Sequence, residues 1–214
     1  MPTRAPAMKP DERRAHLEGA AITVLRREGR GATTKGIATE AGVAEGTIFR
    51  VFETKEELIQ AALARACDPS PLLDQIAEID AHSPLRAKIL AVVTAYQRHL
   101  VDLFELMNAV GIMRPPESVR HRATKSHTRV HEPVHVQMLA LIEPHAHQLT
   151  VTPTHLVRVL RLLTFSGSNA HIAHGHLLTP EQIVHIVLDG AVRPGSAEDQ
   201  DTFGAADSKD STRC

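Results

Sequence analysis

The chain has 214 residues with 24 Lys or Arg, 25 Asp or Glu and a formal net charge of -1 at pH 7, so any affinity for nucleic acid must come from charges placed locally. Its two cysteines, Cys67 and Cys214, lie far apart and do not make a disulfide framework. The first residues lack the apolar core of a secretory signal and no apolar run reaches the ~18 residues of a membrane span, so we expect a cytoplasmic protein without membrane association.

Apolar residues at helical spacing predict a first helix over residues 11–29. Thr33 then stands where it would cap a short helix of about residues 34–41, and Gly42 can take the positive φ that ends it. A second short helix is expected over about residues 45–52. Two short helices joined by a tight turn that contains glycine make a helix-turn-helix motif.

The side chains of this motif divide into an inner and an outer face. Four apolar residues are expected to face inward: Ile37, Ala38, Val43 and Ile48. Thr47 and Arg50 are expected to point outward, where the second helix of such a motif enters the major groove. Of the two aromatic residues here, we expect Phe52 in the core and Phe49 half exposed.

Later helix starts are marked by a hydroxyl residue before proline, a favoured arrangement at the first turn. The four dipeptides are Ser70-Pro71, Ser83-Pro84, Thr152-Pro153 and Thr179-Pro180. In addition, Thr54 with Glu57 and Thr179 with Gln182 have the spacing of a capping box. We find no strand alternation and no internal repeat, so the predicted fold class is all-α.

Residues 10–60 resemble the DNA-binding domain of the TetR (tetracycline repressor) family of bacterial regulators. The resemblance is carried by TTKGIATEAGV from Thr33, by EGTIF from Glu45, and by the pattern F-x-x-K-E-x-L from Phe52 to Leu58. It implies an N-terminal three-helix domain with a helix-turn-helix, followed by a C-terminal helical domain that binds a ligand and forms a dimer.

The chain accordingly divides into four predicted parts. The DNA-binding domain spans residues 10–60, and the ligand-binding and dimerisation domain spans residues 61–193. Small and polar residues predict a mobile arm over residues 1–9 and a disordered tail over residues 194–214.

The function implied by the resemblance is that of a transcriptional regulator, with a repressor favoured. Such a protein binds palindromic operator DNA as a homodimer and is released by a small ligand, here of unknown identity and largely apolar. Carried over to this sequence, the implied DNA-binding residues are Thr33, Thr34, Lys35, Glu45, Thr47, Phe49, Arg50 and Lys55. Glu45 suits the helix dipole, but it stands close to where phosphates approach and is expected to oppose binding.

Three positions depart from the pattern of the family. Many members have Ser at the position of Ala44, often Tyr at Phe49, and commonly His or Tyr at Val51. The missing polar groups imply a weaker clamp on the DNA backbone.

Two apolar sets in the C-terminal part suggest sites, although both could equally form the core. The candidate ligand-binding residues are Val93, Tyr96, Leu100, Phe104, Met107, Val134, Met138, Leu141 and Ile142. The candidate dimer interface, two helices from each subunit about a two-fold axis, comprises Leu156, Val159, Leu160, Leu163, Ile183, Val184, Val187 and Leu188.

Fourteen histidines raise the alternative of a small helical metal-binding protein or a metal-sensing regulator. One cluster is HIAHGH, with His171, His174 and His176; the other has His121, His127, His131 and His135. The last three repeat every four residues, as helical metal ligands do, but Pro133 interrupts them and no HExxH pattern is present. Surface histidines are the plainer interpretation. We find no nucleophile elbow, P-loop or dinucleotide fingerprint, and predict no enzyme, no metal and no cofactor.

Overall fold

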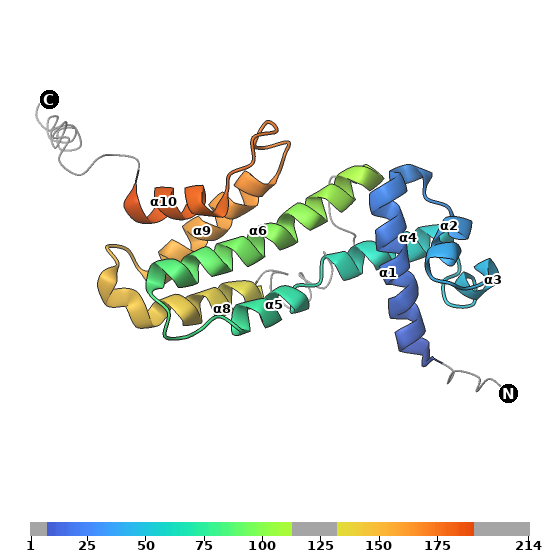
Figure 1. The fold of residues 1–214 in the computed structure, drawn as a ribbon, viewed down its shortest axis with the longest axis horizontal. Coiled ribbons are helices and arrows are strands. Elements are labelled where there is room, and N and C mark those ends of the chain that lie inside the picture. Colours follow the sequence, from blue (N-terminus) through green and yellow to red (C-terminus); the bar gives the residue numbers. More distant parts are fainter. Residues whose placement is uncertain (1–7, 113–131, 191–214) are drawn as a thin grey trace, which may run out of the picture.

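The computed structural model describes residues 8–112 and 132–190, and within these ranges it contains helices and no strand (Figure 1). This confirms the predicted all-α fold class. In the described part, no helix combines the length and apolar character needed to cross a bilayer. The elements in chain order are α1 (Pro10–Glu28), η1 (Gly29–Gly31), α2 (Thr34–Glu40), α3 (Glu45–Ile48), α4 (Lys55–Ala66), α5 (Ser70–Ala77), α6 (Leu85–Val110), α8 (Glu132–Ile142), η2 (Glu143–Gln148), α9 (Pro153–Ser168) and α10 (Pro180–Asp189).

Two apolar cores divide the described chain. The first is built mainly by α1 to α4 and includes Leu17, Val24, Ile37, Ile48, Phe52, Leu58 and Leu63. The second is built by α5, α6, α8, α9 and α10 and includes Ile76, Val93, Tyr96, Leu100, Val134, Met138, Val157, Leu160 and Ile183. The predicted boundary after residue 60 falls inside α4, whose Leu63 still belongs to the first core.

The longest helix, α6, joins the two cores (Figure 1). Its 26 residues span about 39 Å at the usual rise of an α-helix. Its first half packs against α5, α9 and α10, whereas its last turns lie beside α1 and η1, and Leu106 enters the first core. The end of α6 is therefore in direct contact with the N-terminal domain.

Polar contacts fix the end of α6 to η1. Arg30 donates from Nε to the carbonyl of Val110 at 3.1 Å and from a terminal nitrogen to the carbonyl of Gly111 at 3.2 Å. These are carbonyls at the end of a helix, where the intrahelical donors run out. Gly29 has a φ of 56°, and a Cβ built there would lie 2.6 Å from the carbonyl oxygen of Ala109. The junction thus requires glycine.

Two of the predicted hydroxyl caps are confirmed. The Thr152 side chain accepts from the backbone N–H of His155 at 3.3 Å. Thr179 and Gln182 form the full capping box: Thr179 accepts from the backbone of Gln182 at 3.2 Å, and the Gln182 side chain accepts from the backbone of Thr179 at 2.8 Å.

At the other two hydroxyl-proline pairs a helix does start as predicted, but the predicted capping by the serine hydroxyl is wrong. Ser70 is the first residue of α5 and donates to Asp68, and Ser83 precedes Pro84, which is itself the cap position of α6. Ser83 also donates to a nearby aspartate, Asp80, at 3.3 Å. In each case an aspartate two or three residues earlier engages the hydroxyl in a local turn.

Candidate nucleic-acid interface

The turn between α2 and α3 has the geometry that the sequence predicted. The Thr33 hydroxyl accepts from the backbone N–H of Gly36 at 3.0 Å and so caps α2. Gly42 has a φ of 66° and ends the helix, while the backbone N–H of Val43 donates to the carbonyl of Ala38 at 2.9 Å. The chain is thereby reversed within a few residues, and α3 is set against α2.

The inner face of the motif is also as predicted. Ile37, Ala38 and Ile48 are buried in the first core, and Val43 packs against it partly buried. Phe52 is 1% exposed, whereas Phe49 is 49% exposed. The guanidinium of Arg14 lies 4.4 Å from the centre of the Phe52 ring, a cation–π contact that ties α1 to the end of the motif.

The second helix is shorter than predicted. It was expected over residues 45–52, but α3 ends at Ile48 and the chain continues as turns. Its cap position is Ala44, which has no side chain to accept a hydrogen bond, and Gly46 lowers helix propensity. Beyond Ile48 the backbone tightens, since Val51 donates to the carbonyl three residues earlier. Arg50 therefore projects from a turn.

The predicted DNA-contacting cations are available for a ligand. Lys35 in the first turn of α2 and Arg50 after α3 are exposed, and Lys55 at the start of α4 is partly exposed. Within the described residues, none of the three forms an ion pair. Thr33 is exposed, and Thr47 is partly buried.

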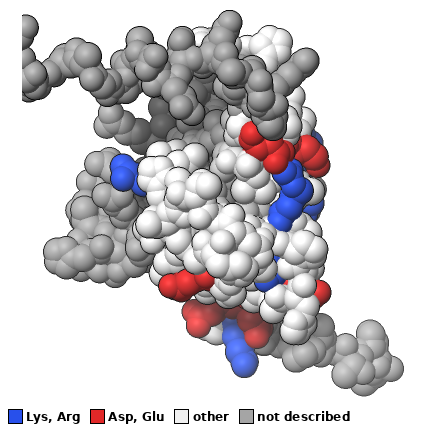
Figure 2. Space-filling model, turned by 90° about the vertical axis from the view of Figure 1, so that its left-hand side faces the viewer, with Lys and Arg blue, Asp and Glu red and all other residues white. Residues whose placement is uncertain are grey.

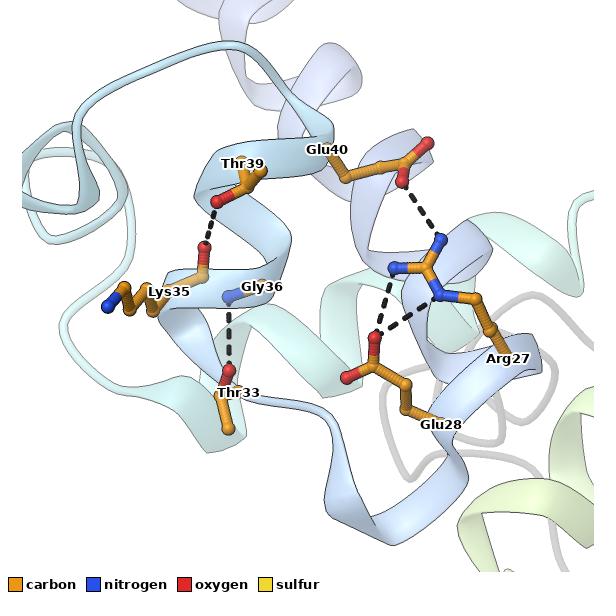
Figure 3. Close-up of polar contacts among 7 residues, drawn as sticks. All are labelled: Arg27, Glu28, Thr33, Lys35, Gly36, Thr39 and Glu40. Atoms are coloured by element: carbon orange, nitrogen blue, oxygen red, sulfur yellow. Dashed lines mark hydrogen bonds and ion pairs between the residues drawn. The ribbon is translucent and has the colours of Figure 1, made fainter.

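A shallow hollow lies beside α2, lined by Arg27, Thr33, Lys35, Gly36, Thr39 and Glu40. Arg27 donates to Glu40 at 3.1 Å and to Glu28 at 3.0 Å (Figure 3), and both carboxylates raise the pKa of Arg27, Glu28 most strongly. Lys35 points away from these residues (Figure 3). The Arg27–Glu40 pair braces α2 against α1 and leaves Lys35 as the cation of this hollow that is not neutralised.

The residues that hold α2 against α1 were not predicted from the sequence. Arg27 and Glu40 are separated by 13 residues, and His16 reaches the carbonyl of Ala41, 25 residues away, at 2.9 Å. Neither pair has a spacing that a local motif specifies, so no sequence signal pointed to them.

Thr34 and Glu45 contact one another directly. The Thr34 hydroxyl donates to the Glu45 carboxylate at 2.5 Å, joining the first turn of α2 to the first turn of α3. Resemblance had suggested that Thr34 donates to a phosphate and that Glu45 opposes one. In the unbound protein the two side chains engage each other, so this hydroxyl must leave Glu45 before it can donate to DNA.

The opposite end of the molecule has a different surface. Viewed from that end, the described residues carry few charged side chains over the middle of the face, and Lys, Arg, Asp and Glu lie mostly toward its edges (Figure 2). The described residues visible at this end do not form the concentration of positive charge that phosphate binding requires.

Comparison with known proteins agrees with this geometry. Residues 19–62 match the family model described as bacterial regulatory proteins, tetR family, a range that runs from α1 into α4. The N-terminal domain of this chain is a TetR-family domain. Within the family domain the helix-turn-helix is thus the DNA-binding element, as the sequence predicted.

Solved structures extend the likeness beyond the matched residues. A tetR-family transcriptional regulator from Streptomyces coelicolor is 25% identical, with 86% of this chain and 80% of that chain covered and a TM-score of 0.57. A TetR/AcrR-family regulator from Thermobifida fusca is 22% identical, with 85% and 99% covered and a TM-score of 0.60. FadR from Bacillus subtilis, solved in complex with stearoyl-CoA, is 12% identical, with 83% and 99% covered and a TM-score of 0.56. The structures from Thermobifida fusca and Bacillus subtilis show that this chain shares its C-terminal fold with them.

The residues predicted to line a ligand pocket lie together, with one exception. Val93, Tyr96, Leu100, Val134, Met138 and Ile142 are buried in the second core, and Phe104 and Leu141 pack against it partly buried. Met107 instead packs in a small separate cluster with Cys67 and Leu103, near the end of α4. Burial raises the pKa of the Cys67 thiol to about 11.

The residues predicted to form the dimer interface divide between core and surface. Leu156, Leu160, Ile183 and Val184 are buried within the protomer, so they close its own core, whereas Val159, Leu163, Val187 and Leu188 are partly buried. The large exposed apolar side chains on these two helices are different ones. They are Leu162 and Phe165 on α9, at 60% and 38% exposure, and Ile186 on α10, at 45% exposure.

The metal-site alternative finds no support in the described residues. No three side chains among His, Cys, Asp and Glu are grouped there in a way that would hold a metal ion, although His135, His171, His174 and His176 are all included. His121, His127 and His131 lie outside the described residues, as do the arm over residues 1–7, the tail from residue 191 and Cys214.

Proposed function

We propose that this protein is a ligand-responsive repressor that binds a palindromic operator as a homodimer. The observation that carries the proposal is a set of three cations, Lys35, Arg50 and Lys55, that have no acidic partner among the described residues and lie on one helix-turn-helix domain of the TetR family. Lys35 and Lys55 stand in the first turns of α2 and α4, where backbone N–H groups also favour anions. Arg50 follows α3 and is the candidate for contact with base edges.

The DNA-binding residues proposed are those that the resemblance implied. Thr33 and Lys35 position the backbone at α2, Lys55 does so at α4, and Thr47 and Arg50 face the bases. The hydrogen bond between Thr34 and Glu45 either breaks when DNA binds or stays formed, in which case both side chains meet the DNA as a pair. Because Ala44, Phe49 and Val51 bring no polar side chain, the clamp on the backbone depends chiefly on the lysines.

We further propose that the second copy docks on the outer faces of α9 and α10. Leu162 and Phe165 lie three residues apart on α9 and so share one face, and Ile186 provides the apolar side chain on α10. Paired α9 and α10 from two subunits would bury these side chains in a four-helix interface with two-fold symmetry. A palindromic operator follows from that symmetry, since each half-site faces an identical subunit.

Release by a small molecule is proposed to act through α6. The second core surrounds the first half of this helix, and Arg30 attaches its last carbonyls to the N-terminal domain. A ligand that spreads α6 from α8 and α9 would shift this end and change the separation of the two DNA-binding domains. FadR from Bacillus subtilis, which shares the fold, holds stearoyl-CoA, consistent with a largely apolar ligand here.

The test begins with footprinting on genomic DNA to recover the operator, followed by titration of a labelled duplex. The proposal predicts two protomers bound per palindrome and an affinity that falls steeply with salt. Retained binding to a single half-site with the same affinity, or no salt dependence, would contradict it.

A further inference from the structure

A partly buried arginine in the C-terminal domain has no counter-charge among the residues that the structure describes. Arg161 lies on α9 next to the core residue Leu160, and its Nε atom is buried without a hydrogen-bond partner among the residues that the structure describes. It forms no ion pair within that part of the chain, whereas Arg14, Arg27 and Arg86 each pair with a carboxylate. A desolvated guanidinium N–H without an acceptor is unfavourable, so an acceptor supplied from outside would bind strongly here.

The guanidinium of Arg161 lies close to Tyr96 on α6. Tyr96 is 2% exposed, and this burial raises the pKa of its hydroxyl, while the neighbouring positive charge and hydrogen bonding of Arg161 oppose the rise. The influence of Arg161 on Tyr96 places the arginine head at the contact between α9 and α6, facing the second core.

The helix that packs against both, α8, contributes a second unmatched polar atom. The side-chain oxygen of Gln137 is buried and has no donor among the described residues. Gln137 stands one turn after Val134 and next to Met138, both fully buried. The layer formed by α6, α8 and α9 thus consists largely of apolar side chains and contains two buried polar atoms, Nε of Arg161 and the side-chain oxygen of Gln137, without a partner among the described residues.

These groups define a ligand by its chemistry. Apolar walls bind an apolar body, and a guanidinium binds a planar anion such as a carboxylate through parallel N–H donors. We propose that the C-terminal domain binds a small apolar organic acid whose anionic group is held by Arg161. This names the ligand class of the proposed regulator and rests on that function, although the binding step is measured without DNA.

The test uses two dyes that share one ring system. The anionic probe is 8-anilinonaphthalene-1-sulfonate, and the neutral probe is N-phenyl-1-naphthylamine, which lacks the sulfonate. Each is titrated into the full chain, and binding is followed by dye emission and by quenching of tyrosine emission, which reports Tyr96 alone because the sequence has one Tyr and no Trp. The variants are Arg161→Met and Arg161→Lys, with Arg158→Met as the control because Arg158 is exposed one turn earlier on α9.

Arg161→Met is expected to weaken binding of the anionic dye by about tenfold or more, since a charged hydrogen bond is lost, and to leave the neutral dye unchanged. Arg161→Lys keeps the charge and is expected to retain part of the affinity, while Arg158→Met behaves as the parent. The inference is overturned if neither dye binds, if Arg161→Met binds the anionic dye as the parent does, or if it weakens both dyes equally. Titration of operator DNA with the same variants, in the absence of dye, separately tests the proposed function.

Discussion

Lys55 stands at the first position of α4 with two glutamates after it, yet neither forms an ion pair with it. The Glu57 carboxylate instead accepts from the backbone N–H of Glu53 at 2.7 Å. The predicted capping box is therefore half formed: Thr54 accepts from the backbone of Glu57, but the return bond reaches Glu53. This arrangement leaves the Lys55 ammonium available to a phosphate.

Lys55→Ala is expected to flatten the slope of log affinity against log salt by roughly one unit per half-site, because one neutralised phosphate is lost. The loss should be nearly the same for all sequences, since phosphate contacts carry no base information. Fluorescence anisotropy over a series of salt concentrations measures this. Arg158→Ala removes the same charge from an exposed position on α9 and should leave the slope unchanged. Equal slopes for the parent and Lys55→Ala would remove Lys55 from the interface.

His99 on α6 provides a pH-dependent contribution to stability. Burial lowers the pKa of His99 below its ordinary value of 6.5, although Asp102 and Asp68 nearby oppose the shift. The unfolded chain therefore takes up a proton before the folded one does, and the free energy of unfolding falls as the pH drops through about 6.5. Urea unfolding at several pH values should show a smaller decline for His99→Gln than for the parent.

The control for this series is His155→Gln, because His155 is exposed at the start of α9. A decline as steep in His99→Gln as in His155→Gln would show that other groups cause the pH dependence.

Local sequence signals predicted the elements best where one residue and its near neighbours decide the structure. The start of α10 followed from Thr179 and Gln182, and the end of α2 from Gly42. The helices α5 and α6 do start beside Ser70 and Ser83, but these hydroxyls donate to Asp68 and Asp80 and do not cap the helices. The extent of α3 was overestimated because apolar spacing continued past a weakly capped helix.

The junction between η1 and α6 makes a prediction about two neighbouring glycines. Gly29→Ala should destabilise the protein by about 2 kcal/mol or more, because it combines a left-handed φ with a clash against the backbone of Ala109. Gly31→Ala is the control, since a Cβ there meets no atom within 4 Å, and its effect should stay within about 0.5 kcal/mol. Denaturant unfolding of both variants measures the difference. Equal free energies of unfolding for Gly29→Ala and Gly31→Ala would mean that η1 does not pack closely against α6.

At the scale of the whole molecule, the sequence was least informative about which helix faces pack within one protomer and which remain exposed. Apolar spacing selected the faces of α6, α8, α9 and α10, but it did not separate residues that close the core of one protomer from those that a second copy would cover. Leu160 and Val184 proved to be core, while Leu162 and Ile186 are exposed. Likewise Arg161 belongs to no local motif, and only the packing of the helices shows that its Nε atom has no hydrogen-bond partner among the described residues.

The proposed dimer predicts that Leu162→Asp combined with Ile186→Asp gives a folded monomer, because two charges would be buried at the interface. Sedimentation velocity measures the mass, and circular dichroism checks the helix content. Val136→Asp is the matched control: Val136 is 57% exposed on α8, so this change should leave the dimer intact. A double variant that remains a full-affinity dimer would place the interface elsewhere.

We expect the helix-turn-helix from α2 to Arg50 to recognise a specific DNA sequence. Selection from a randomised duplex pool, at one fixed salt concentration, tests it on the parent, Arg50→Ala and Lys55→Ala together. Arg50→Ala is expected to lose discrimination at one base position in each half-site, by about 1–3 kcal/mol, while Lys55→Ala is expected to bind more weakly with its base preferences intact. A parent without sequence preference, or an Arg50→Ala profile identical to that of the parent, would contradict it.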